Sequence, residues 1–215
     1  MIISSKKTLK ALLIAIIVVF VSTKSFAENP IRIMLYGDSL MAGYGLSPSE
    51  NLSAELNRNF ETSGSSIIII NASISGNTSK NGLSRLDWSL EDNPSIVVLS
   101  LGANDMLRGL NPELTMQNLD SIINKFKKNG SIVILAGMLA SESMGPKYQS
   151  QFDGIYPELA KKYDLIFMPF LLDGVALDKK YLQADYKHPN APGIKIIASN
   201  LYPYIIEAIA GVEFK

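Results

Sequence analysis

The sequence contains no cysteine and only one histidine, His188, and these two shortages restrict its chemistry. Without cysteine there is no disulfide, no thiol nucleophile, no thiolate zinc site and no lipid-modified amino-terminal cysteine. A single histidine excludes a catalytic zinc site built from several imidazoles. A metal site would have to rest on carboxylates, and no segment resembles a calcium-binding loop. We therefore expect neither a metal nor another cofactor.

An excess of charge of one sign is also absent, because 20 basic residues balance 20 acidic ones in the 215-residue chain. The basic residues form no cluster or stripe, so we expect no nucleic-acid partner. Hydrophobic residues make up 47% of the chain, which is enough for the core of one ordinary globular domain. No repeat, linker or low-complexity stretch follows residue 27, so the sequence predicts a single domain over residues 28–215.

The apolar run near the amino terminus is too short for an ordinary membrane span. Three lysines precede the apolar stretch 11–21, whereas a spanning helix needs roughly 20 apolar residues. Residues 25–27, Ser-Phe-Ala, place small side chains at the two positions that a signal peptidase reads. We predict a signal peptide over residues 1–27 and an exported protein, periplasmic or secreted, with no stable membrane span after cleavage. Lys24, inside the cleavage region, keeps an uncleaved anchor open as the alternative.

Short apolar runs that alternate with helical patterns predict an α/β fold. Five runs are typical of buried strands: 31–36, 67–70, 96–101, 132–136 and 165–167. Each run precedes a segment with apolar residues at helical spacing, which predicts helices over about 49–60, 82–91, 111–129, 152–163 and from 192 onward. Pro157 and Pro203 are expected to bend the last two. This alternation indicates a doubly wound parallel sheet with helices on both faces.

The first predicted strand ends in Gly37-Asp38-Ser39-Leu40. In an open α/β sheet ligands bind just beyond the carboxyl ends of the strands, so Ser39 is placed to meet a substrate. A serine hydroxyl needs a base, and His188 follows Asp185 by three residues. That spacing lets a turn bring the carboxylate onto Nδ1 and leaves Nε2 for the serine. On these residues alone, a capped strand-to-helix turn and a surface histidine remain open.

Two further loops at the same sheet edge carry hydrogen-bond donors. Gly76 follows the second predicted strand and Asn104 follows the third. Acyl transfer needs donors aimed at the oxyanion that forms when serine attacks a carbonyl. The backbone N–H groups of Ser39 and Gly76 and the side-chain amide of Asn104 are suitable. Taken singly, Gly76 is equally consistent with a flexible loop, and Asn104 with a turn that caps the following helix.

Four blocks of the sequence together resemble the SGNH, or GDSL-type, hydrolase superfamily. They are Gly37-Asp38-Ser39-Leu40, Ser75-Gly76-Asn77-Thr78, Gly102-Ala103-Asn104-Asp105 and Asp185-Tyr186-Lys187-His188-Pro189. Two further stretches, 155–157 and 169–170, are similar to the bacterial branch of arylesterases and the multifunctional thioesterase/lysophospholipase. The resemblance implies a three-layer α/β/α fold of flavodoxin-like type with a five-stranded parallel sheet.

The resemblance also implies roles for individual residues. Ser39 would be the nucleophile, His188 the base and Asp185 the group that orients it, with Gly76 and Asn104 completing the oxyanion hole. Asp38, next to the nucleophile, is expected to hydrogen-bond within the turn and not to serve as the triad acid. Relatives usually carry a small residue and then an apolar one between the aspartate and the histidine. Tyr186 and Lys187 stand there in this sequence, which makes the rim bulkier and more basic and leaves the substrate open.

We therefore predict an exported serine esterase that acts through an acyl-enzyme on small-molecule esters, either lipid-like or aryl. Short- to medium-chain acyl esters, aryl esters, acyl thioesters and lysophospholipids all fit. Apolar side chains near the active edge are candidates for an acyl groove, above all Met106, Leu107, Met138 and Met144, and beside them Met41, Leu46, Leu110 and Leu139. The alternative is that they only pack loops against the core.

Two rival functions also remain open. A carbohydrate O-acetyl esterase is the rival enzyme, and a catalytically silent periplasmic binding module on the same fold is a rival of another class. A classical α/β-hydrolase fits less well, because the chain contains no Gly-x-Ser-x-Gly elbow. The oligomeric state stays open.

Overall fold

The computed structural model describes residues 30–61 and 66–212. The predicted signal peptide, residues 1–27, therefore lies outside the described residues. Within the described ranges no helix combines the length and apolar character that a membrane crossing requires.

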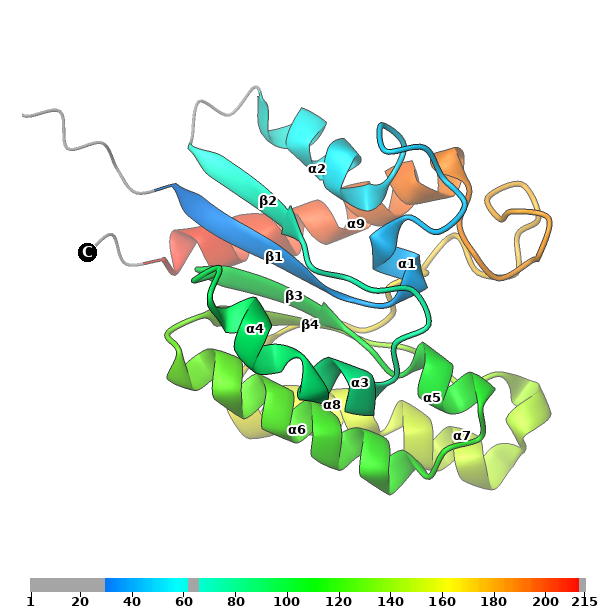
Figure 1. The fold of residues 1–215 in the computed structure, drawn as a ribbon. Coiled ribbons are helices and arrows are strands. Elements are labelled where there is room, and N and C mark those ends of the chain that lie inside the picture. Colours follow the sequence, from blue (N-terminus) through cyan, green and yellow to red (C-terminus); the bar gives the residue numbers. More distant parts are fainter. Residues whose placement is uncertain (1–29, 62–65, 213–215) are drawn as a thin grey trace, which may run out of the picture.

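A five-stranded parallel sheet forms the centre of the fold (Figure 1). Its strands are β1 (Ile31–Gly37), β2 (Ile67–Asn71), β3 (Ile96–Ser100), β4 (Ile132–Ala136) and β5 (Ile166–Met168), in the order β2-β1-β3-β4-β5. This order is the flavodoxin-like one, with the reversal of strand order between β1 and β3. The predicted three-layer α/β/α fold is confirmed.

The two central strands explain the continuous apolar runs in the sequence. All five residues of β3 are buried, and in β1 only Arg32 is partly exposed. A strand covered by helices on both faces has no solvent side, so its sequence does not alternate. The edge strand β2 differs from the prediction of a buried strand, because its side chains are half-buried or exposed and Ile68 is 40% exposed.

Helices cover both faces of the sheet (Figure 1). One face carries α2 (Leu52–Glu61) and α9 (Ala191–Ala210), which pack against each other. The other face carries α3 (Ser79–Ser84), α4 (Leu86–Leu90), α6 (Pro112–Lys128) and α8 (Ile155–Tyr163). The start of α6 follows from its sequence, because Asn111 accepts a hydrogen bond from the Glu113 N–H and proline occupies the first turn.

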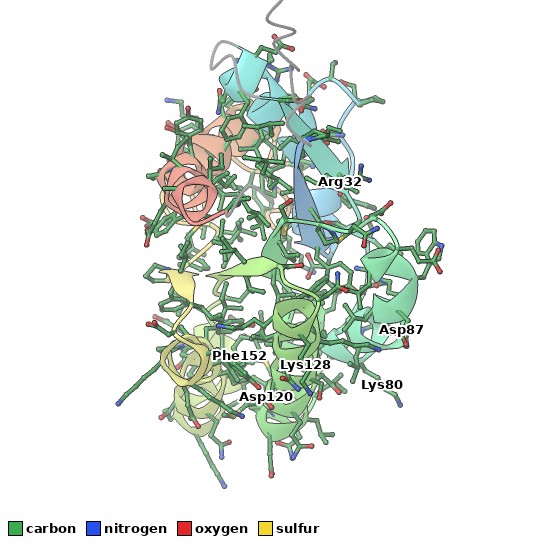
Figure 2. All side chains as sticks on the ribbon, turned by 90° about the vertical axis from the view of Figure 1, so that its left-hand side faces the viewer. Arg32, Lys80, Asp87, Asp120, Lys128 and Phe152 are labelled. Atoms are coloured by element: carbon green, nitrogen blue, oxygen red, sulfur yellow. The ribbon has the colours of Figure 1, made fainter. Side chains whose placement is uncertain are left out.

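Side chains divide between the core and the surface as the sequence pattern predicts. Phe152 lies fully buried within the helical layer, whereas the charged side chains of Lys80, Asp87 and Lys128 project outward (Figure 2). Burying a side chain of the size of phenylalanine or leucine contributes about 1.5–3 kcal/mol, so the interfaces of the sheet with its two helical layers dominate the stability.

Two predicted helices are each divided in the structure. The segment 82–91 forms α3 and α4, which meet at Arg85, and the segment 152–163 is split at Gly154 into α7 (Pro146–Asp153) and α8. The expected bend at Pro157 is wrong, because this proline lies in the first turn of α8, where a missing N–H removes no helical hydrogen bond. Pro203 does lie inside α9, and the helix continues through it to Ala210.

Three short helices at the carboxyl edge of the sheet were not predicted. They are α1 (Ser39–Ala42), α5 (Ala103–Leu107) and the 3-10 helix η1 (Glu142–Met144). The first two begin directly after β1 and β3, on either side of the point where the strand order reverses. This is the place at which doubly wound sheets bind their ligands.

Candidate active site

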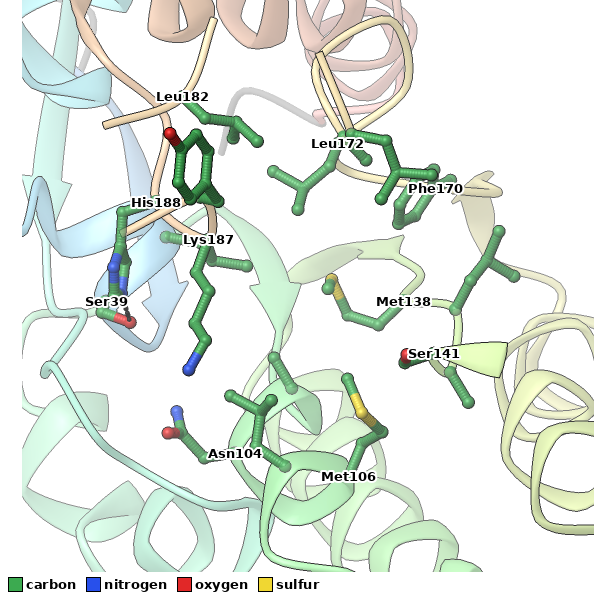
Figure 3. Close-up of a pocket in the computed structure, with 18 of the residues that line it drawn as sticks. Ser39, Asn104, Met106, Met138, Ser141, Phe170, Leu172, Leu182, Lys187 and His188 are labelled. Atoms are coloured by element: carbon green, nitrogen blue, oxygen red, sulfur yellow. Dashed lines mark hydrogen bonds between the residues drawn. The ribbon is translucent and has the colours of Figure 1, made fainter. Parts of the chain in front are cut away.

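Three of the predicted residues lie in one line of contacts at this edge. Ser39 is the first residue of α1, and its Oγ lies 2.9 Å from His188 Nε2 (Figure 3). The other ring nitrogen, His188 Nδ1, lies 2.5 Å from Asp185 Oδ2. The structure thus joins residues from both ends of the domain, Ser39 after β1 and the Asp185–His188 turn before α9.

The turn that carries the histidine is held by its own backbone. Asp185 Oδ1 accepts the backbone N–H groups of Lys187 and His188, each at 3.0 Å. The hydrogen bond with His188, followed by these two N–H bonds, lowers the pKa of the Asp185 carboxyl to about 2. The carboxylate therefore stays ionised and keeps the imidazole oriented at neutral pH.

One glutamine ties this turn to the serine side of the site. The Gln183 N–H donates to the His188 carbonyl at 2.8 Å, and its side-chain Nε2 donates to the Tyr44 carbonyl at 2.7 Å. Tyr44 follows α1, and its ring centroid lies 4.5 Å from that of His188. The imidazole is thus positioned by packing as well as by Asp185.

The predicted oxyanion donors also lie together. The backbone N–H groups of Ser39 and Gly76 have no acceptor within the described part of the chain. Gly76 has a φ of +81°, a conformation that favours glycine. Asn104 Nδ2 donates to Asp38 Oδ2 at 3.3 Å and to the Asn77 carbonyl at 3.1 Å. The first contact is long, so the amide hydrogen facing Asp38 can be shared with a second acceptor as a three-centre bond.

A pocket of about 830 Å³ opens beside these groups. Ser39, Asn104 and His188 line one end of it, and the opposite side is apolar, with Met138 and Phe170 (Figure 3). Its size is that of an ordinary small-molecule site. The arrangement can therefore present the hydroxyl of a serine, backed by a base, to a bound molecule with an apolar part.

Comparison with known proteins agrees with this geometry. Residues 35–196 match the GDSL-like Lipase/Acylhydrolase family. The chain belongs to this family. Esterase TesA of Pseudomonas aeruginosa is 36% identical over 172 residues, covering 80% of this chain and 86% of the relative. Thioesterase 1/protease 1/lysophospholipase L1 of Escherichia coli is 38% identical over 167 residues, covering 77% of this chain and 79% of the relative.

A solved structure of the psychrotrophic esterase EstA from Pseudoalteromonas sp., inhibited by monoethylphosphonate, superposes with a TM-score of 0.79. It is 31% identical and covers 84% of this chain and 99% of that one. The family and these relatives make this protein an esterase or acylhydrolase, as predicted. Within residues 30–61 and 66–212, no group of three or more histidine, cysteine or acidic side chains is placed to hold a metal ion.

Asp38 has two functions in this GDSL-family site. Its Oδ1 accepts the Leu40 N–H at 3.0 Å, which is the turn hydrogen bond expected from the sequence, and its Oδ2 accepts from Asn104. The side chain is only 2% exposed. Burial, opposed by these hydrogen bonds, raises the pKa of the Asp38 carboxyl from 3.8 to about 6. A buried carboxylate thus orients the Asn104 amide from behind.

The position of Asn104 also depends on the glycine two residues earlier. Gly102 has a φ of +120°, and a Cβ there would lie 2.3 Å from Tyr156 Oη. That hydroxyl donates to the Leu101 carbonyl at 3.0 Å and anchors the end of β3. Any other residue at position 102 would displace the start of α5, on which Asn104 lies.

Arg85, which the sequence analysis did not identify, links the loops of the site. Its guanidinium donates to Asn77 Oδ1 and to the Ala72 carbonyl, both at 2.7 Å, and to the Gly37 carbonyl at 3.2 Å. It also lies over the Tyr36 ring, 4.0 Å from the centroid. The Asn77 carbonyl in turn accepts from Asn104, so Arg85 connects the ends of β1 and β2 to one of the predicted oxyanion donors.

The structure places only some of the candidates for the acyl groove beside the pocket. Met106, Leu107, Met138 and Leu139 line the pocket. The assignment of Met144 to the groove is wrong, because η1 turns this side chain toward Gly109, outside the lining. Three further candidates also lie outside the pocket lining, namely Met41, Leu46 and Leu110. Met41 is fully buried in the core. The segment between β5 and α9 supplies lining residues that were not predicted as such: Phe170, Leu172, Ala176, Leu177 and Leu182.

Proposed function

We propose that this protein is an exported serine esterase that hydrolyses carboxylic esters through an acyl-enzyme intermediate. The observation that carries the proposal is the contact of Ser39 Oγ with His188 Nε2 at 2.9 Å, backed by Asp185, at the mouth of an apolar pocket. In this mechanism Ser39 Oγ bonds to the ester carbonyl carbon while His188 Nε2 takes its proton. Collapse of the tetrahedral intermediate breaks the bond to the alcohol oxygen, which receives that proton. Water then repeats both steps and releases the acid.

The oxyanion of the tetrahedral intermediate would be met by three donors. These are the Ser39 and Gly76 N–H groups, whose hydrogens have no acceptor in the described chain, and the Asn104 amide. Such donors act mainly on the transition state because charge on the carbonyl oxygen develops only there. Asp38, Asn77 and Arg85 position them.

The acyl group would occupy the apolar part of the pocket, between Met106, Met138 and Phe170. The apolar side chains of this part of the pocket favour short- to medium-chain acyl or aryl esters over a carbohydrate O-acetyl substrate, whose hydroxyl groups would lose their water against them. The names of the relatives support acyl thioesters and lysophospholipids as further substrates of the same site. A silent binding module would not need the Ser39–His188–Asp185 contacts.

Export rests on the sequence of residues 1–27, with its lysine-flanked apolar run and Ala27. Mature protein from the native envelope should begin at Glu28. Amino-terminal sequencing checks this, and recovery of Met1 in the membrane fraction would favour the uncleaved anchor instead.

The catalytic proposal is tested with 4-nitrophenyl esters from acetyl to palmitoyl, together with acyl thioesters. Ser39→Ala should lower kcat/KM by about 10⁴-fold or more, because the nucleophile and its base act as a unit. Ser141→Ala is the matched control, since Ser141 lines the same pocket but has no histidine partner. A phosphonate inhibitor should label Ser39, as found by mass spectrometry of the peptide. Full activity of Ser39→Ala, or labelling of another serine, would refute the assignment.

A further inference from the structure

Lys187 extends across the mouth of the pocket. It stands between Asp185 and His188 in the chain, and its backbone N–H is fixed by Asp185 Oδ1 at 3.0 Å. From there its side chain points toward the Asn104 amide, and Lys187 is one of the residues that line the pocket (Figure 3). Its ammonium group has no ion pair or hydrogen bond with any residue of the described ranges.

The two acidic groups on the same side of the pocket as Lys187, Asp185 and Asp38, already have other partners. Asp185 accepts from His188, and Asp38 lies buried behind Asn104. Two further acidic residues line the pocket, Glu142 in η1 and Asp153 at the end of α7, whose Oδ1 accepts the Ala140 N–H at 2.7 Å. Ser141, the residue before Glu142, lies across the pocket from Lys187 (Figure 3), and Asp153 is bonded to the neighbouring Ala140. Arg108, the cation on the Gly76 carbonyl, is not part of the lining.

A bound ester would cover this ammonium group and remove part of its water. Such a loss is unfavourable unless the substrate supplies a negative group in exchange. The acyl chain has the apolar end of the pocket, with Met138 and Phe170. The alcohol oxygen must face His188 Nε2, from which it receives its proton, and Lys187 is the adjacent residue. A negative group would therefore lie on the alcohol side of the ester.

We propose that Lys187 selects esters whose alcohol part carries a carboxylate or phosphate close to the scissile bond. The proposal rests on the proposed esterase function and names its substrate class. Lys187 acts here as a specificity-determining residue: it attracts the anionic ester over a neutral one of the same shape. Within residues 30–61 and 66–212, no other lysine or arginine lines the pocket.

The test compares two esters of equal size, 3-(butanoyloxy)benzoate and the neutral 3-(butanoyloxy)benzamide. The measured quantity is the ratio of their kcat/KM values, in which intrinsic reactivity cancels between variants. Lys187→Met should lower this ratio about five-fold, the effect of one partly solvated ion pair, and Lys187→Glu should lower it further. In the wild-type enzyme the ratio should fall as salt rises from about 20 to 500 mM, because salt screens such a pair. 3-(Butanoyloxy)phenyl phosphate, as a third probe, separates preference for phosphate from preference for carboxylate.

Lys180→Met is the matched control. Lys180 lies in the same segment and its loss changes the net charge equally, but it is not part of the pocket lining and its ammonium lies over the Tyr181 ring. The control should keep the wild-type ratio. An unchanged ratio in Lys187→Met, or an equal loss of activity on both esters, would overturn the proposal while leaving the esterase function intact. If the wild-type enzyme hydrolyses neither ester nor any 4-nitrophenyl ester, the esterase function itself fails.

Discussion

The buried carboxyl of Asp38 makes the stability of the protein depend on pH in a way that one substitution reveals. Asp38→Asn removes the ionisable group and keeps an oxygen that can accept the Leu40 N–H. The new amide also faces the Asn104 amide, donor against donor, which costs about 1–3 kcal/mol of folding free energy at every pH. The pH dependence separates this constant cost from the effect of ionisation.

The magnitude follows from the raised pKa. In the folded protein the pKa of Asp38 is about 6, against 3.8 for an ordinary aspartate. The folded state therefore holds the proton more tightly, and the stability that this provides is complete below pH 3.8 and lost as the pH rises through 6. One pH unit of displacement is worth about 1.4 kcal/mol, so the wild-type protein should lose about 3 kcal/mol from this group between pH 3.8 and 7. Asp38→Asn loses none of it.

Urea unfolding at pH 4, 5, 6 and 7, followed by circular dichroism, measures the difference. Tryptophan fluorescence is a poor probe of unfolding here, because the single tryptophan, Trp88, is already 70% exposed in the folded protein. The free energy of unfolding of Asp38→Asn, relative to wild type, should rise by about 2.4 kcal/mol from pH 4 to pH 7, because about 0.5 kcal/mol is already lost at pH 4. Contributions from Asp185 and other shared groups cancel in the comparison. Asp173→Asn, which removes an exposed carboxylate, should show no such step. A difference that stays flat between pH 4 and 7 would refute the argument that burial raises the pKa of Asp38.

Three further predictions concern the reaction itself. Asn104→Ala should lower kcat by about 10²–10³-fold with little change in KM. Unchanged kcat in a folded variant would leave Asn104 with only a structural role, through its bonds to Asp38 and Asn77. The double variant of Ser39→Ala and His188→Ala should have about the same kcat as either single variant, because the two residues act as a unit. A much lower kcat in the double variant would show that Ser39 and His188 act independently. Met138→Lys should depress hydrolysis of long-chain esters more than of acetyl esters, whereas Met144→Lys, outside the pocket, should leave that ratio unchanged.

The strands and the reaction could be predicted because both leave short, local patterns. A strand buried on both faces is a run of apolar residues, so β1 and β3 were found within one residue of their observed ends. The parallel sheet then places the residues that follow its strands at one edge. The sequence therefore predicts that Ser39, Gly76 and Asn104 lie together.

The helices that carry two of these residues were missed for a physical reason. With four residues in α1 and five in α5, neither helix completes two turns, so no apolar period can be seen. The division of longer helices at Arg85 and Gly154 is equally hidden, because the apolar spacing continues across each break. Arg85 donates to the backbone carbonyls of Ala72 and Gly37. Every residue has such a carbonyl, so the sequence could not indicate these partners.

The substrate could not be predicted because its pocket depends on chain without regular structure. Residues 169–190 contain no helix or strand, yet they hold Phe170, Leu172 and Leu182 against the pocket. Two positions there, Leu177 and Tyr186, have φ values of +67° and +56°, which neither side chain favours locally. Backbone bonds hold the turn at Tyr186, whose N–H donates to the Gln183 carbonyl at 3.0 Å, and the Asn190 N–H closes the turn on the Tyr181 carbonyl at 2.9 Å. Substitutions at Phe170, Leu172 or Leu182 can therefore change the substrate while the contacts of Ser39 and His188 stay in place. The motifs indicate the reaction because they hold the reacting groups, whereas the residues that select the substrate lie in a segment that has no such pattern.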